Sequence, residues 1–216
     1  MVTIINEEIE HYLRGLVPER PGIMTEMERY AAENHVSIIP PEVARFLTLL
    51  VHISGARDIL EIGTAIAYST IWLAWAADSR EGHVTTIEIN DRRARKAREN
   101  IRTAGLEDRI TLLKGHAVDI IPELQDRYDF IFVDAARGQY GWFFEELYPR
   151  LRPGGLLVSD NVLAEGRVIT PDEDLRHRQK TAARRLRDYL QMITSHEGLE
   201  TAVMPMGDGI AVSMKK

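Results

Sequence analysis

The sequence predicts an α/β fold in which a mostly parallel sheet carries helices on both faces. Short apolar runs at 58–62 and 128–133 have the length and continuous hydrophobicity of buried parallel strands. Stretches of helical periodicity alternate with such runs along the chain. Between the first run and its helix lies a turn of small residues, within D-I-L-E-I-G-T-A-I-A-Y-S-T from Asp58 to Thr70. We therefore expect seven strands, the last two of which form an antiparallel hairpin.

Composition limits the possible functions. At 216 residues, with 44% hydrophobic and 28% charged residues, the chain is expected to fold as one domain over 1–216. The absence of cysteine excludes disulfides, thiolate chemistry and thiolate-held zinc. A net charge of −6 argues against indiscriminate nucleic-acid binding, although a local basic face can still bind RNA. Acidic residues occupy the start, and no stretch reaches membrane-spanning length, so we expect a cytoplasmic protein without a membrane partner.

The N-terminal quarter of the chain has a helical pattern. Residues 4–35 read as helix with a break at 18–21, where prolines interrupt the periodicity. Met24, Met27 and Tyr30 recur at helical spacing. They are expected either to pack within the chain or to form a face that meets a second copy. Residues 1–53 together are interpreted as a lid or dimer element.

A connector and one further helix lead into the first strand. V-S-I-I-P-P at 36–41 is expected to be extended, because a residue before proline is disfavoured in the α region. This connector is a candidate lid. Residues 42–53 repeat their apolar positions at helical spacing and are expected to form core.

The turn after the first strand is interpreted as a cofactor loop. Small residues at Gly63, Ala65 and Ala67 let the backbone approach a ligand closely. The alternative is an ordinary strand-to-helix turn. Glu88 lies at the end of the next strand, 83–89, about 20 positions beyond the turn, where a carboxylate can bind the two hydroxyls of a ribose. The alternative for Glu88 is a solvated carboxylate at a strand end.

The middle of the chain continues the alternation of helix and strand. Residues 91–104 are predicted as a basic helix and 110–113 as a strand. That strand ends at Gly115-His116-Ala117, a turn that would face the base of a bound nucleoside. A helix over 117–124 is expected before the strand at 128–133.

Two neighbouring strands end on oxygen ligands. Asp134 follows the strand at 128–133, and Asp160-Asn161 follow the strand at 156–159, which comes after a Pro-Gly-Gly turn at 153–155. Two carboxylates and an amide oxygen form a hard ligand set that suits Mg²⁺ or Ca²⁺. The alternative is that these residues cap helices.

The C-terminal part combines a loop, a basic helix and the hairpin. Residues 164–175 are predicted as a mobile loop, and 176–191 as a helix with six cations and no acid in its first twelve residues. That run is either a solvated helix face or a contact for RNA phosphates. The segments 201–204 and 210–214 are predicted to pair across a tight turn.

These motifs resemble the class I, S-adenosylmethionine (SAM)-dependent and metal-dependent O-methyltransferases typified by catechol and caffeoyl-CoA enzymes. The resemblance implies a Rossmann-like fold with a seven-stranded sheet. Within the family, D-A-A-R-G-Q-Y from Asp134 to Tyr140, and D-N-V-L from Asp160 to Leu163 followed by Gly166, look closest to the bacterial tRNA 5-hydroxyuridine methyltransferases. The likeness implies methylation of 5-hydroxyuridine in tRNA, with a small catechol-type acceptor as the alternative.

The resemblance also assigns residues and partners. The cofactor SAM is implied to contact Ile39, Glu61, Gly63, Ser69, Glu88, His116, Ala117 and Asp134. Mg²⁺ or another hard divalent cation is implied to bind Asp134, Asp160 and Asn161. A homodimer is implied as well.

Three positions depart from the family pattern. Ala67 stands where glycine is usual, which is tolerable if its φ is negative. His116 stands where a small or acidic residue is common. Arg137 replaces the lysine that acts on the substrate hydroxyl in catechol enzymes, and a guanidinium stays protonated and cannot act as a base. We therefore expect the metal to activate the hydroxyl, with Asp134 and Arg137 as the catalytic residues and Arg137 acting as a charge partner. The alternative is a surface arginine beside the site.

Two other function classes remain open from sequence alone. An NAD-dependent enzyme shares the small-residue turn and the ribose acid, but the chain lacks G-x-G-x-x-G and this class gives no role to Asp160-Asn161. A non-catalytic binding protein would bind neither SAM nor metal.

Overall fold

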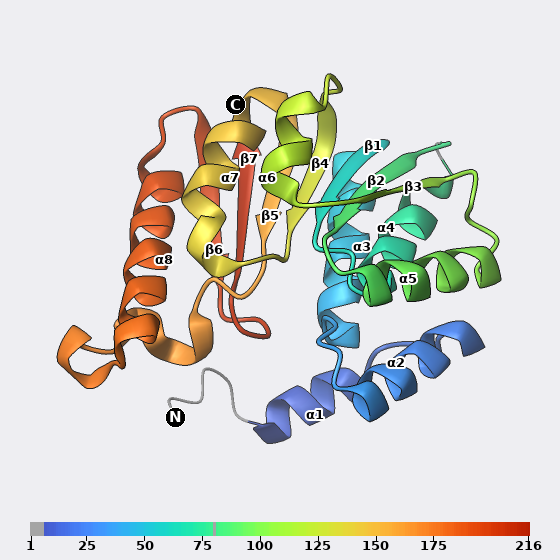
Figure 1. Cartoon of the computed structure of the whole chain (residues 1–216), viewed down its shortest axis with the longest axis horizontal. Coiled ribbons are helices and arrows are strands. Elements are labelled where there is room, and N and C mark those ends of the chain that lie inside the picture. The colour runs from blue at the N-terminus through green and yellow to red at the C-terminus, as the bar shows by residue number, and fades with distance from the viewer. Residues whose placement is uncertain (1–6, 80) are drawn as a thin grey trace.

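The described residues of the computed structural model, 7–79 and 81–216, form a seven-stranded sheet between two layers of helices (Figure 1). The strands are β1 (Asp58–Ile62), β2 (His83–Glu88), β3 (Ile110–Lys114), β4 (Tyr128–Val133), β5 (Leu151–Ser159), β6 (Leu199–Met204) and β7 (Ile210–Lys215). Their order is β3-β2-β1-β4-β5-β7-β6. Strands β1 to β5 run parallel, and β7 and β6 pair antiparallel. The predicted sheet and its C-terminal hairpin are confirmed.

Helices cover both faces of the sheet. They are α1 (Glu7–Gly15), α2 (Gly22–Asn34), α3 (Pro41–Ser54), α4 (Tyr68–Asp78), α5 (Asp91–Thr103), α6 (Ala117–Ile120), α7 (Tyr140–Leu147) and α8 (His177–Ser195). Side chains of β4 alternate between the two layers, as a strand with a period of two requires. Phe130 and Phe132 join the core under α2 to α5, while Ile131 and Val133 join the core under α7 and α8. Because both faces are buried, the strand reads as a continuous apolar run.

The N-terminal helices are separated by the predicted proline break. Residues 4–6 of the predicted helical segment lie outside the described part of the chain. Met24 is 0% exposed and Met27 is 2% exposed, and both pack into the chain's own core. The hypothesis that these methionines meet a second copy is therefore wrong. The exposed large apolar side chains of residues 8–35 are Ile9, Tyr12 and Leu13 on α1 and Leu16 directly after it.

Helix α2 is fastened to the start of α4. The guanidinium of Arg20 donates two hydrogen bonds, of 2.9 and 3.0 Å, to the carboxylate of Glu28. The hydroxyl of Tyr68 donates to the same carboxylate at 2.7 Å. Since Tyr68 is the first residue of α4, the N-terminal helices are attached directly to the segment that follows the cofactor loop.

Several elements differ from the sequence prediction. The helix expected over 117–124 ends at Ile120 and continues as a 3-10 turn, Ile121–Glu123, because Pro122 has no N–H to donate. The Pro-Gly-Gly segment is part of β5, with an irregular register opposite β4. The segment 164–175 contains two 3-10 turns, Ala164–Ile169 and Asp172–Asp174. Among the described helices, none is both long and apolar enough to cross a bilayer.

Candidate active site

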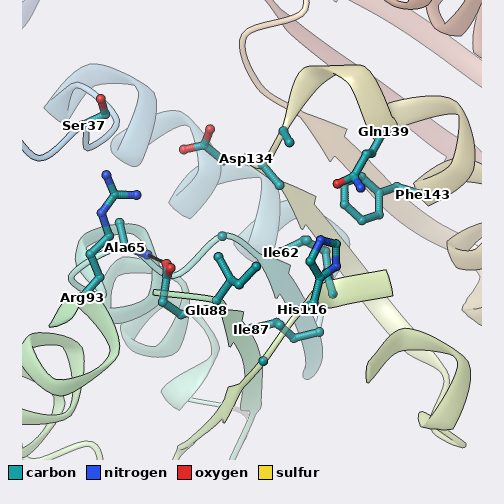
Figure 2. A pocket seen from close by; sticks show the side chains of 16 residues that line it. Ser37, Ile62, Ala65, Ile87, Glu88, Arg93, His116, Asp134, Gln139 and Phe143 are labelled. Atoms are coloured by element: carbon teal, nitrogen blue, oxygen red, sulfur yellow. Dashed lines mark hydrogen bonds between the residues drawn. The ribbon is translucent and has the colours of Figure 1, made fainter. Parts of the chain in front are cut away.

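A cavity of about 350 Å³ lies beside the carboxyl ends of β1, β2 and β4 (Figure 2). The chain order of the strands reverses between β1 and β4, and in open α/β sheets such a switch point is where ligands bind. Five of the predicted cofactor residues line the cavity, namely Gly63, Glu88, His116, Ala117 and Asp134. The structure thus brings together segments separated by up to 71 positions in sequence.

The turn after β1 makes a close approach between two strands. Gly63 has φ +107, and a Cβ added there would lie 2.0 Å from the backbone oxygen of Asp134. The N–H groups of Gly63 and Thr64 both donate to the carbonyl of Ile87 on β2. The small residue is therefore required by the packing of the sheet as well as by access to the cavity.

Ala67 adopts a left-handed backbone conformation, which favours the glycine that is usual at this position in the family. Its φ is +71, and it is completely buried at the N-terminus of α4. The condition of a negative φ is therefore not met. A left-handed conformation costs a residue with a Cβ about 1 kcal/mol or more, and the surrounding packing must hold it.

Glu88 is held with its carboxylate at the cavity wall. It is 4% exposed, and its two oxygens each accept a backbone N–H at 2.8 Å, from Ala65 and from Asn90. These bonds tie the cofactor loop to the end of β2. Each carboxylate oxygen has a further lone pair, so the group can still accept hydrogen bonds from a pair of hydroxyls in the cavity.

Glu61, on β1, is buried among hydroxyl groups. It is 0% exposed and accepts hydrogen bonds from the hydroxyls of Ser69 at 2.5 Å, Thr86 at 2.6 Å and Thr70. Burial raises the pKa of Glu61, and the three hydroxyls act in the opposite direction. Neither Glu61 nor Ser69 is among the cavity-lining residues. The structure brings this pair together as a buried link between β1, β2 and α4.

His116 caps the short helix α6 at the cavity edge. Its Nδ1 accepts the N–H of Val118 at 3.1 Å, so a neutral ring carries its proton on Nε2. Figure 2 places this ring across the cavity from Glu88. Nε2 is thus available as a donor to a bound base, in keeping with the sequence expectation for this turn.

The lining residues to which the sequence assigned no role include Ser37, Arg93, Gln139 and Phe143. Ser37 belongs to the predicted connector, whereas Ile39 of the same connector is 4% exposed and packs in the core. The connector therefore meets the cavity two residues earlier than expected. Arg93 lies in the first turn of α5, Gln139 in the 3-10 turn Arg137–Gln139 and Phe143 in α7.

The three predicted metal ligands lie at the ends of β4 and β5. Asp160 is 2% exposed, and its Oδ1 accepts the N–H of Asn161 at 2.7 Å. Asn161 has φ +57, which turns the chain directly after the strand. The hydroxyl of Tyr140 donates to the carbonyl of Asp160 at 2.8 Å and thereby holds this end of β5 in place.

The two carboxylates disfavour each other's charge. The pKa of Asp134 is raised to about 7, first by burial and then by the negative charge of Asp160. The pKa of Asp160 is raised to about 6, chiefly by burial. Arg137 lowers the pKa of both groups. A positive charge placed between these carboxylates would therefore be stabilised.

The predicted cation ligands are all oxygen donors. No group of three His, Cys, Asp or Glu side chains with the arrangement of a metal site occurs among residues 7–79 and 81–216. The predicted set has two carboxylates, and its third protein ligand is the amide oxygen of Asn161. Two carboxylates and an amide oxygen are compatible with a hard cation that keeps water or substrate ligands. The chemistry of the set fits Mg²⁺.

Arg137 lies beside this set and is paired with a residue that sequence reasoning missed. Its Nη2 lies 3.0 Å from Oδ2 of Asp208 and donates to Oδ1 of Asn161 at 3.2 Å. Asp208 belongs to the turn between β6 and β7, about 70 positions downstream. The Gly-Asp-Gly sequence indicated a turn but gave no sign of which residue it would face. The side chain of Arg137 is 28% exposed and is held by one hydrogen bond and one ion pair, so it is not a freely solvated surface arginine.

Several arginines of the basic helix form ion pairs or hydrogen bonds within the chain. Asp172, just outside the acid-free run, forms ion pairs with Arg184 and with Arg187, the latter at 2.8 Å. Arg185 donates to the carbonyl of Gly138 at 3.1 Å, next to Arg137. Part of the run therefore holds neighbouring loops of the same chain.

Comparisons with known proteins agree with this geometry. A family model described as O-methyltransferase matches residues 17–216. A catechol O-methyltransferase of Niastella koreensis is 31% identical over 223 residues, with 98% of each chain covered. A catechol O-methyltransferase of Mycobacterium tuberculosis is 35% identical over 190 residues, covering 85% of this chain and 83% of that protein. The crystal structure of an O-methyltransferase from Bacillus cereus in complex with SAH has a TM-score of 0.86 at 31% identity, with 97% of each chain covered.

Proposed function

The chain belongs to the O-methyltransferase family, and on that premise we propose that it methylates one hydroxyl of a small catechol-type acceptor with the help of a divalent cation. Its activity class is SAM-dependent O-methyl transfer of the catechol and caffeoyl-CoA type. The observation that carries the proposal is that Asp134, a predicted cation ligand, lines the cofactor cavity and also interacts electrostatically with Asp160, a second predicted ligand. A methyl donor and a cation-bound hydroxyl would meet there.

The small-molecule acceptor is better supported than tRNA. Two of the relatives carry the name catechol O-methyltransferase, and neither name refers to RNA. The basic helix, one interpretation of which was a contact for RNA phosphates, uses Arg184, Arg185 and Arg187 in contacts within the chain. Methylation of 5-hydroxyuridine in tRNA stays a prediction with less support.

We assign the cofactor contacts to the residues that line the cavity. Glu88 would accept the two ribose hydroxyls, because its oxygens are already oriented by two N–H groups. His116 and Ala117 would face the adenine, and Gly63 would leave room for the backbone to approach the cofactor. Glu61 and Ser69 would support the loop from behind rather than touch the cofactor.

The chemistry assigned to the cation site follows from its ligands. Asp134, Asp160 and Asn161 would hold the ion, which supplies a positive charge that lowers the pKa of a hydroxyl bound to it. Arg137 cannot remove the proton itself and would contribute a fixed positive charge beside the acceptor. Phe143 and Gln139 line the same cavity and would help to exclude water.

A homodimer is proposed on a different surface from the one first expected. Since Met24 and Met27 are internal, the exposed apolar side chains of α1 would form the contact. Light scattering at micromolar concentration should give twice the chain mass, and Leu13→Asp should reduce it to the monomer. A monomeric mass for the unaltered protein would contradict the proposal.

The proposed function is tested by one assay with two classes of acceptor, small molecules and tRNA. Purified protein is incubated with SAM and with catechol, caffeoyl-CoA or tRNA containing 5-hydroxyuridine, in Mg²⁺ or in excess chelator. Mass spectrometry should detect methylated catechol-type product with Mg²⁺ and little of it in chelator. Methylation of tRNA alone would overturn the acceptor assignment, and full activity in chelator would overturn the cation assignment.

A further inference from the structure

Asp208 is held in place from several directions. The carbonyl oxygen of Asp208 accepts the N–H of Leu163 at 3.0 Å, and its Oδ1 accepts the N–H of Glu165. The next residue, Gly209, has φ +89, and a Cβ there would lie 2.3 Å from Cγ of Leu163. The turn between β6 and β7 is thus packed on the segment that follows β5, which fixes Oδ2 of Asp208 beside the site.

Arg137 is shared between this carboxylate and Asn161. A single atom, Nη2, lies 3.0 Å from Oδ2 of Asp208 and 3.2 Å from Oδ1 of Asn161. The same amide oxygen is the proposed third ligand of the cation. A guanidinium and a divalent ion repel each other when they approach one oxygen, so the position of Arg137 affects how readily Asn161 binds the ion.

The charges around Arg137 indicate which groups it would interact with if Asp208 did not hold it. Asp160 interacts electrostatically with both Asp208 and Arg137, and Asp134 interacts with Arg137 as well. If the charge of Asp208 were absent, the guanidinium would still interact electrostatically with the two carboxylates of the cation site. Arg137 would then act as an internal cation and compete with the metal.

We propose that Asp208 is a positioning residue that holds Arg137 beside the cation site and so keeps the two carboxylates, Asp134 and Asp160, available to a divalent ion. The inference rests on the proposed cation site but not on the identity of the acceptor. It also assigns a function to the β6–β7 turn, which the sequence analysis described only as a hairpin connection.

A double-mutant cycle on cation affinity tests this role. The dissociation constant for Mg²⁺ is measured by calorimetry, without acceptor, for the unaltered protein, Asp208→Asn, Arg137→Gln and the double variant. Asparagine keeps an oxygen that can accept the N–H of Glu165. Asp208→Asn should weaken Mg²⁺ binding about tenfold, and Arg137→Gln should tighten it. In the Arg137→Gln background, the effect of Asp208→Asn should shrink to about twofold or less, because Asp208 acts through Arg137.

Control variants separate positioning from charge and from folding. Asp78→Asn removes the same charge from an ion pair with Arg109 at the end of α4 and should leave Mg²⁺ affinity unchanged. Thermal unfolding confirms that each variant is folded. If Asp208→Asn is unfolded, Asp208→Glu, which keeps the charge, should retain Mg²⁺ affinity within about threefold.

Each outcome of the cycle is decisive. Equal effects of Asp208→Asn in both backgrounds would mean that Asp208 acts only through its own charge, which overturns the inference. Absence of Mg²⁺ binding to the unaltered protein would overturn the cation site and the inference together. A coupled cycle in a protein that fails to methylate catechols would support the role of Asp208 while the acceptor assignment fails.

Discussion

Gly63 and the backbone of Asp134 are in contact where β1 and β4 end, so that the cofactor loop and the first predicted metal ligand share one packing interface. A methyl group on Gly63 would lie 2.0 Å from the carbonyl oxygen of Asp134. This contact joins the two halves of the site through the backbone. Substitutions in the loop should therefore shift the position of Asp134, the first predicted cation ligand.

Gly63→Ala should destabilise the protein severely. The substitution adds a clash with backbone to the strain of φ +107, and together these should lower the free energy of unfolding by about 3 kcal/mol or more. Urea denaturation measures the change. Gly105→Ala is the matched control, because Gly105 has φ +69 but open space around it, and it should cost only about 1 kcal/mol. Equal losses for both variants would contradict the role of the contact.

Glu61→Gln should affect stability more than cofactor affinity. The carboxylate accepts three hydroxyl donors, and an amide can offer only one acceptor oxygen, so at least one hydroxyl loses its partner. We expect a loss of about 1–3 kcal/mol in the free energy of unfolding. The dissociation constant for SAM, measured by calorimetry, should change less than threefold. A large loss of SAM affinity in a stable variant would return Glu61 to the cofactor contacts.

Glu88→Ala should weaken SAM binding directly. The variant loses the acceptors for the ribose hydroxyls and also releases the N–H of Ala65. Each charge-assisted hydrogen bond contributes about 1.5–3 kcal/mol, which corresponds to a loss of at least about tenfold in affinity. Glu107→Ala removes an exposed carboxylate on the turn before β3 and serves as the control. Unchanged SAM affinity would leave Glu88 with a structural role only.

The sequence predicted the sheet and most of the site because those features are local. Apolar runs defined the seven strands, and residues that follow strand ends defined Glu88, Asp134 and Asp160. The errors concern contacts between distant segments. Helical periodicity could not tell whether Met24 faced its own core or a second copy. The partner of Arg137 lies about 70 positions away, and no local pattern links the two.

The metal-free protein should lose stability as the pH rises through the range in which Asp134 ionises. The pKa of Asp134 is about 7 in the folded chain, well above that of a solvated aspartate. Between about pH 4 and 7 the folded state binds one more proton at this site than the unfolded state, so the free energy of unfolding falls, by at most about 1.4 kcal/mol per pH unit.

Asp134→Asn isolates this contribution. Urea unfolding of both proteins in chelator, from pH 5 to 8, should show the variant gaining on the unaltered protein as the pH rises. Addition of Mg²⁺ should reverse the trend in the unaltered protein, because the ion favours the ionised carboxylate. A constant difference between the two proteins across this range would contradict the assignment.

The last prediction separates catalysis from docking on the basic helix. Arg185 bonds the carbonyl of Gly138 in the loop that carries Arg137, so Arg185→Ala should lower methyl transfer to every acceptor, by several-fold for a lost hydrogen bond of about 1 kcal/mol. Arg178 is exposed on the same helix, and Arg178→Glu should leave catechol methylation unchanged. Initial rates with catechol and with tRNA are compared for both variants. If tRNA is the acceptor, Arg178→Glu should weaken its methylation and lower the salt dependence of binding, because a phosphate contact is lost. A lower rate for Arg178→Glu on tRNA but not on catechol would favour the RNA acceptor. If only Arg185→Ala lowers the rate, and does so on catechol, the basic helix acts by holding the loop that carries Arg137.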